Sequence, residues 1–310
     1  MRALPFAIAF VLAGLLASPM LCALEARGQL RFNYRGRKLP CPLGVLIVAA
    51  AVLALVPVVL IERLGHVAVL YPRFVAAALY TLGVALLGLI DDALGSPASL
   101  EHSGPADPSS LQSHARDDLS PPTAASFPSP RGWRGHGQAV MRGEFSPGAL
   151  KAAGSLGLAL LAMSLTGLST GRWLLASAVL VLATGALNLL DLRPGRAVKV
   201  FVALGAALAI GSGELHTLWT LGLFVGPALI AGAYDLRERA MLGDTGSNLL
   251  GALAGLWLVF SLGERSQLIA LGLLIVLTVY GELRSISTLI ERVPLLRKLD
   301  SIGRPEQPLK

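Results

Sequence analysis

Charged residues are scarce in this chain of 310 residues. Asp, Glu, Lys and Arg together make up only 15% of it, whereas 54% of the residues are apolar and the mean hydropathy is +0.66. A soluble globular domain of ordinary composition contains about 25% charged residues. The deficit excludes a protein whose whole surface faces water.

Cysteine is also rare, and the two that occur form no disulfide framework. Cys22 lies in an apolar run and Cys41 in a basic loop, so both are interpreted as small apolar side chains. The chain is basic, with a formal net charge of +7. No soluble basic domain accompanies this charge, so we expect no nucleic-acid partner. Basic loops in a membrane protein are better explained by its topology.

Long apolar runs dominate the remainder, and each can cross a hydrocarbon core, which needs about 20 helical residues. They show no period-2 alternation, so helices are predicted rather than a barrel. The expected fold is an all-α polytopic bundle of about nine transmembrane helices that form a single membrane domain. The first span is interpreted as a retained anchor, with a signal peptide as the alternative. The predicted spans are 3–24, 42–61, 67–90, 152–169, 173–190, 198–213, 215–234, 246–262 and 266–281.

Basic residues divide unequally between the two sides of this predicted bundle. With nine spans, 21 of the 26 Lys and Arg residues fall on one side. Lys and Arg mark the cytoplasmic side of a membrane protein. The predicted topology therefore has the N-terminus outside and the C-terminus inside. The five basic residues on the outer side are Arg2, Arg63, Arg73, Arg172 and Arg265.

Two segments on the cytoplasmic side differ from the spans. Residues 96–130 are rich in Ser, Pro, Ala, His and Asp, and are predicted to be a disordered insertion because they offer little apolar surface to bury. The spacing of His102, His114 and His136 matches no compact metal site. Residues 285–310 are predicted to form a cytoplasmic tail, whose segment 285–299 is amphipathic enough to lie on the membrane.

Polar residues gather where three of the predicted spans meet the cytoplasmic side. Asp91 and Asp92 close the third span, Asn188 and Asp191 close the fifth, and Asp244 opens the eighth. Acids at the ends of apolar spans are costly and usually functional. Carboxylates beside Lys- and Arg-rich loops suit Mg²⁺ that is shared with a phosphate substrate. Gly243 and Gly246, on either side of Asp244, would let backbone N–H groups approach phosphate.

In their order, these motifs resemble those of the polyprenyl-phosphate N-acetylhexosamine-1-phosphate transferases, which include phospho-N-acetylmuramoyl-pentapeptide transferase. The resemblance spans most of the chain and rests on short motifs. They are Lys38 with Pro40 and Gly44, Asp91-Asp92-x-x-Gly95, Gly132-Trp-Arg-Gly-His136, Gly148-x-x-Lys151, Asn188-x-x-Asp191, Gly243-Asp-x-Gly-Ser247, and Glu282 to Ser287.

The resemblance implies transfer of a sugar-1-phosphate from a UDP-sugar to polyprenyl phosphate, with release of UMP, in cell-envelope glycan synthesis. Mg²⁺, or Mn²⁺ in its place, would be the cofactor. By resemblance, Asp91 and Asp92 would hold or deprotonate the lipid phosphate, and Asp244 with Asn188 would bind the metal. The implied substrate-binding residues are Asp191, Lys38, Lys151, Gly243, Gly246, Ser247 and His136.

The same resemblance implies a bacterial inner-membrane protein whose active face is cytoplasmic. Its partners would be the polyprenyl phosphate, the UDP-sugar and membrane lipids, and homodimerisation is left open. Two family features are absent: the Asp that helps to bind uracil after Asn-x-x-Asp, and the His motif after the ninth span. These absences keep open a non-catalytic descendant that binds lipid-linked intermediates or scaffolds envelope enzymes. A transporter is a third alternative, although it would place its acids near mid-bilayer.

Overall fold

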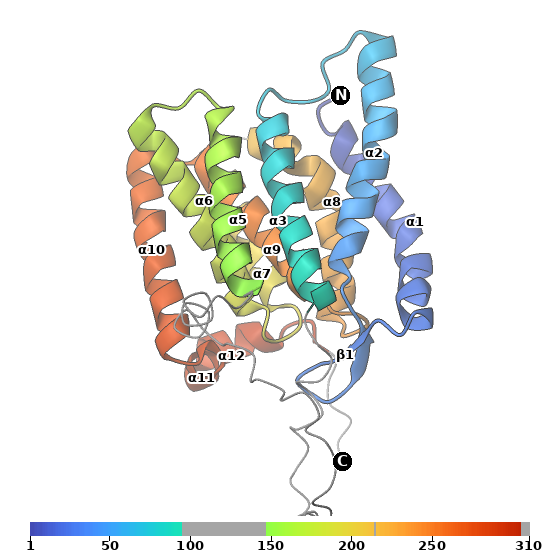
Figure 1. The fold of residues 1–310 in the computed structure, drawn as a ribbon, viewed down its shortest axis with the longest axis vertical. Coiled ribbons are helices and arrows are strands. Elements are labelled where there is room, and N and C mark those ends of the chain that lie inside the picture. Colours follow the sequence, from blue (N-terminus) through green and yellow to red (C-terminus); the bar gives the residue numbers. More distant parts are fainter. Residues whose placement is uncertain (95–146, 214, 305–310) are drawn as a thin grey trace, which may run out of the picture.

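The structure, a computed structural model, describes residues 1–94, 147–213 and 215–304 (Figure 1). Within these ranges nearly all regular structure is helical, and the only strands form one short hairpin of β1 (Leu30–Phe32) and β2 (Lys38–Pro40). The long helices are α1 (Leu4–Ala26), α2 (Gly44–Gly65), α3 (Phe74–Leu94), α5 (Pro147–Ser164), α6 (Thr170–Leu190), α7 (Arg196–Ser212), α8 (His216–Leu236), α9 (Gly243–Ser261) and α10 (Glu264–Leu283). Two short helices follow, α11 (Ile286–Arg292) and α12 (Pro294–Ser301).

The predicted class, an all-α membrane protein, is confirmed by the lengths and the apolar composition of the helices. Among the described residues, six helices are long and apolar enough to cross a membrane, namely α1, α2, α3, α6, α8 and α10. The other three long helices coincide with predicted spans but are shorter or more polar. Helix α7 has 17 residues, and α9 begins with a polar run that includes Asp244 and Asn248. A count of nine spans therefore stays a prediction.

Among the helix boundaries that differ from those predicted are the starts of α3 and α5. The third span begins at Phe74 rather than at 67, because Pro72 restricts the preceding residue to non-helical backbone. The loop before it is held by the Glu62 carboxylate, which accepts hydrogen bonds from the N–H groups of Val69 and Leu70. At the other boundary α5 begins at residue 147 rather than at 152, so that Lys151 lies within the helix.

Two further segments take a form that the sequence did not predict. The basic loop before α2 contains the β1–β2 hairpin, whose turn is closed by the Asn33 side-chain oxygen accepting bonds from the N–H groups of Arg35 and Arg37. The amphipathic segment 285–299 is two helices rather than one. The break lies at Val293, because Pro294 has no N–H to donate and restricts the residue before it.

Helix α9 runs through the centre of the bundle (Figure 1). Every residue from Thr245 to Val259 is buried, as expected for a helix that is surrounded by other helices. Glycines let the neighbouring backbones approach it closely. A Cβ atom added at Gly44 of α2 would lie 2.2 Å from the Gly246 nitrogen, and one at Gly88 of α3 would lie 2.5 Å from the Asp244 carbonyl oxygen. Small residues at such crossings are typical of helices packed in a membrane.

Candidate functional site

Four polar side chains meet at one end of the bundle, and we call them the acid–lysine cluster: Asp91, Lys151, Asn188 and Asp244. They come from four different helices, α3, α5, α6 and α9. The Lys151 Nζ atom lies 3.2 Å from an Asp91 carboxylate oxygen and 3.1 Å from an Asp244 carboxylate oxygen. The side chain of Lys151 is 16% exposed, so a single ammonium group joins two carboxylates at a half-open site.

Asn188 completes this cluster from the last turn of α6. In the orientation that gives both amide atoms a hydrogen-bond partner, the nitrogen donates to the Ser247 hydroxyl at 2.7 Å and to Asp244 Oδ1 at 3.0 Å. The amide oxygen then accepts a hydrogen bond from Lys151 Nζ at 3.3 Å. Three oxygens from three helices thus converge on one cation. The predicted residues Asp91, Asn188, Lys151, Asp244 and Ser247 are therefore brought together by the fold.

Asp92 has a different position from its neighbour Asp91. Its side chain is only 1% exposed and caps the N-terminus of α9. One carboxylate oxygen accepts from the Asp244 N–H at 3.1 Å, and the other accepts from the Thr245 N–H at 2.8 Å and hydroxyl at 2.7 Å. A carboxylate at a helix N-terminus satisfies unpaired N–H groups and interacts favourably with the helix dipole. Asp92 thereby orients the helix that carries Asp244.

Arg31 of the hairpin holds the other side of Asp92. Its guanidinium lies 3.1 Å from the carboxylate and also donates to the Asp92 carbonyl oxygen at 2.7 Å. The segment after the hairpin is paired with the loop before α9, since the N–H groups of Leu43 and Gly44 donate to the carbonyls of Met241 and Leu242. The hairpin, α2 and the start of α9 therefore form one connected unit.

Two buried acids stabilise the loops on this side of the molecule. Asp235, at the end of α8, accepts hydrogen bonds from the Gly195 and Leu242 N–H groups. Glu238 has a positive φ of 52° and binds the hairpin turn through Asn33 at 3.3 Å and Arg35 at 3.3 Å. Sequence reasoning missed both residues. For Asp235 a signal was present, because it is an acid at the end of an apolar run on the same side as the others.

Asp191 follows α6 directly and is half-buried near the other acids. Burial, followed by repulsion from Asp235 and then from Asp244, raises the pKa of Asp191 well above its usual value. Asp191 therefore binds a proton more readily than an isolated carboxyl group does.

The remaining predicted site residues have other positions. Lys38 is exposed on β2, where its ammonium lies 5.1 Å from the centre of the Phe32 ring. Gly243 has a φ of 69°, and a side chain there would meet the Asp92 carboxylate at 2.9 Å. Gly246 faces Gly44, so it serves helix packing rather than open backbone contact with phosphate. His136 and the insertion predicted at 96–130 lie outside the described residues.

The oxygen atoms of the acid–lysine cluster are of the type that binds a hard cation such as Mg²⁺, but they are too few to complete its ligands. Mg²⁺ prefers six oxygen ligands and is usually held by one or two carboxylates together with phosphate oxygens and water. Asp91 and Asp244 could supply two carboxylates and Asn188 an amide oxygen. Among the described residues, no group of three or more His, Cys, Asp or Glu is arranged to hold a metal alone. Asp91, Asp244 and Asn188 would supply only part of the oxygen ligands that Mg²⁺ prefers, and phosphate oxygens or water would have to supply the others.

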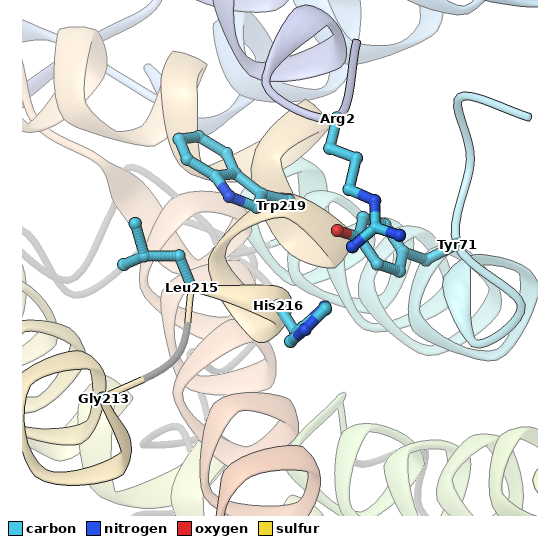
Figure 2. Close-up of a pocket in the computed structure, with 6 residues that line it drawn as sticks. All are labelled: Arg2, Tyr71, Gly213, Leu215, His216 and Trp219. Carbon is cyan, nitrogen blue, oxygen red and sulfur yellow. The ribbon is translucent and has the colours of Figure 1, made fainter.

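A shallow hollow of about 370 Å³ lies at the other end of the bundle (Figure 2). It adjoins Tyr71, which precedes α3, whereas the acid–lysine cluster lies at the end of that helix. The Arg2 guanidinium lies over the Tyr71 ring, and His216 meets this ring edge to face. The lining residues are Arg2, Tyr71, Gly213, Leu215, His216 and Trp219.

No protein-family model matches the chain, and no curated protein matches it.

Proposed function

We propose that the protein is a membrane phosphotransferase that moves a sugar-1-phosphate from a UDP-sugar to polyprenyl phosphate. The observation that carries this proposal is the convergence of Asp91, Asn188 and Asp244 on the Lys151 ammonium at one end of a bundle of apolar helices. Such a cluster combines oxygens for a divalent cation with a cation for phosphate. The order of the motifs along the chain supports the same assignment.

In this proposal the lipid phosphate oxygen attacks the phosphorus that bears the sugar, and the bond to UMP breaks in line. Bound Mg²⁺ would neutralise charge on the diphosphate. Asp244 and Asn188 would hold that cation, and Lys151 would turn from the carboxylates to the phosphate oxygens. Asp91, which has a 24% exposed side chain, would accept a proton from the lipid phosphate. Asp92 is too buried for contact with substrate and would act by orienting α9.

The membrane orientation that goes with this function is N-terminus outside and C-terminus inside, with nine spans. The unequal division of basic residues supports it, because Lys and Arg favour the cytoplasmic side. In this orientation the acid–lysine cluster faces the cytoplasm, where nucleotide sugars are made. We propose a bacterial inner membrane as the location, since a polyprenyl carrier of envelope glycans is used there.

The proposal is tested by a screen for UMP release. Purified protein is incubated with Mg²⁺, polyprenyl phosphate and a panel of UDP-sugars, and the UMP released is measured. We expect turnover with at least one sugar, and we expect Asp244→Asn to reduce it by at least about 10²-fold, as expected when a group that stabilises the transition state is lost. Glu264→Gln, which makes the same acid-to-amide change on an exposed side chain at the start of α10, is the matched control and should retain activity.

The second candidate is a non-catalytic protein that binds lipid-linked intermediates or scaffolds envelope enzymes. It is favoured by the Lys151 ammonium, which already occupies the point where the three oxygens converge. This candidate predicts binding of polyprenyl phosphate without release of UMP from any UDP-sugar. If the protein binds polyprenyl phosphate, releases no UMP and still unfolds cooperatively, so that it is known to be folded, the transferase proposal is rejected.

A further inference from the structure

Helix α12 carries an apolar stripe that no described part of the chain covers. Leu295 and Leu299 are four residues apart in α12, which places them on one side of the helix, and Ile302 directly follows its last residue. Their exposed fractions are 66%, 50% and 57%. Large apolar side chains gathered in this way on a fixed element mark a surface that contacts something else.

A different side of α12 attaches the helix to the bundle. Asp300 accepts hydrogen bonds from the Arg196 guanidinium at 2.8 and 3.0 Å and from Arg304 at 2.8 and 2.9 Å. The Lys199 ammonium donates to the Asp300 carbonyl oxygen at 2.6 Å. With side chains 3%, 8% and 10% exposed, Arg196, Arg304 and Asp300 form a buried clamp. The clamp fixes the rotation of α12 and leaves the stripe facing outward.

Exposed basic side chains lie on the same two helices as the stripe. Lys298 lies beside the stripe, Arg297 lies on the other side of α12, and Arg292 ends α11. The acids of the same segment are already paired: Asp300 in the clamp, and Glu291 with Arg193. The outward surface of α11 and α12 is therefore apolar and positively charged. This combination is typical of helices that lie in a membrane interface and contact anionic lipids.

The segment that carries the stripe follows shortly after α10, a helix with an exposed apolar side. Helix α10 is long and apolar enough to span a membrane, and its outward side chains Ile269, Leu273 and Val276 are 66–67% exposed. At its end Leu283 is 73% exposed, and only two residues separate it from α11. Figure 1 shows α11 and α12 at the end of α10, running across the direction of the long helices.

We propose that α11 and α12 form an interfacial anchor, in which Leu295, Leu299 and Ile302 insert among the lipids while Arg292 and Lys298 bind anionic headgroups. The occupant of the stripe is thus the anionic leaflet of the membrane that the bundle spans. The clamp links this anchor to Arg196, which lies five residues after Asp191. The inference does not depend on the proposed transferase activity.

The test places an environment-sensitive fluorophore at two neighbouring positions of the full chain. Leu299→Cys puts the label on the stripe, and Ser301→Cys puts it on the opposite exposed side of α12 as the matched control. Both are made with Cys22→Ala, because Cys22 is exposed whereas Cys41 is buried. The labelled proteins are placed in nanodiscs of phosphatidylglycerol or of phosphatidylcholine. Quenching is measured with nitroxide-labelled lipid and, separately, with iodide in the water.

We expect lipid nitroxide to quench the label at 299 at least about twofold more than the label at 301, with the reverse order for iodide. The difference should be larger in phosphatidylglycerol than in phosphatidylcholine, and should fall when Arg292 and Lys298 are both changed to Gln. Equal quenching of the two labels by iodide in phosphatidylglycerol would overturn the proposal. So would shielding of the label at 299 from both quenchers, since that result would indicate a second protein copy on the stripe.

Discussion

Asp91 and Asp92 are adjacent in the chain, yet they serve different parts of the molecule. The side chain of Asp91 is 24% exposed and faces Lys151, whereas that of Asp92 is 1% exposed and accepts hydrogen bonds from the first turn of α9. Successive residues of a helix point about 100° apart, so one of the pair can face the half-open cluster while the other faces a neighbouring helix. Asp92 therefore stabilises the start of α9 and does not face the cluster.

Replacement of Asp92 should therefore lower stability more than replacement of Asp91. Asp92→Asn removes the charge that pairs with Arg31 and replaces one acceptor of the α9 cap with a donor. We expect a loss of about 1–3 kcal/mol, the usual cost of leaving buried polar groups unpaired. Thermal unfolding of the purified protein in detergent measures the effect.

Asp91→Asn is the matched comparison, since it makes the same chemical change one residue earlier. Its loss of stability should be smaller, because the site of Asp91 is partly open to water. Equal melting temperatures for the two variants would show that Asp92 does not hold α9.

At the scale of helices, the position of Asp244 depends on how closely α2 and α3 approach α9. The absence of side chains at Gly44 and Gly88 allows direct backbone contact at the first turn of α9. We expect Gly44→Ala to destabilise the protein by about 1–3 kcal/mol, because its Cβ would lie 2.2 Å from the Gly246 nitrogen and the helices would have to separate. Unfolding in increasing denaturant measures the change.

Gly185→Ala is the control for this helix contact. Gly185 lies within α6, and no atom lies within 4 Å of an added Cβ. Alanine is favoured over glycine in a helix by about 1 kcal/mol, so this variant should be neutral or slightly stabilised. If both variants unfold alike, the close approach of α2 and α9 is not required.

The Asp300 clamp gives the tail a predictable dependence on pH. Burial by itself would raise the pKa of Asp300, but the hydrogen bonds and charges of Arg196 and Arg304 outweigh it, and the net pKa lies below the usual 3.8. A depressed pKa contributes stability that is present above the unfolded value and is lost as the pH falls through the folded value. The tail should therefore remain attached at neutral pH and be released only below about pH 4.

Asp300→Asn should produce the same release at neutral pH, at a cost of about 2 kcal/mol to attachment of the tail. Hydrogen exchange of residues 286–301 measures it, with Ser301→Ala as a control that leaves the clamp intact. Unchanged protection in Asp300→Asn would mean that the apolar contacts of α11 hold the tail without the clamp.

For the whole molecule, the unequal distribution of Lys and Arg predicts which end of the bundle faces the cytoplasm. Cysteines at Ser266, at the start of α10, and at Ser301, in α12, should lie on opposite sides of the membrane in a Cys22→Ala background. A thiol reagent that does not cross membranes should label Ser266→Cys in intact cells. It should label Ser301→Cys only after the cells are opened, and the opposite result would invert the topology.

Much of this architecture could be predicted from the sequence, because hydropathy reports directly which segments can lie in lipid. All nine long helices described coincide with predicted apolar runs, although only six meet the length and composition of a membrane span. Helix ends were less predictable. The start of α3 moved to residue 74, because an apolar loop before Pro72 has the same composition as a helix.

The sequence by itself determined that this is a helical membrane protein, and which acids end its apolar helices, since both follow from local composition and order along the chain. Only the tertiary structure decided that Asp91 faces Lys151 and Asp244 while Asp92 caps α9, and that Lys38 lies away on the hairpin. These differences depend on helix rotation and on contacts between residues as many as 153 positions apart. Sequence motifs list the residues of a site, but the directions of their side chains are set by packing against other helices.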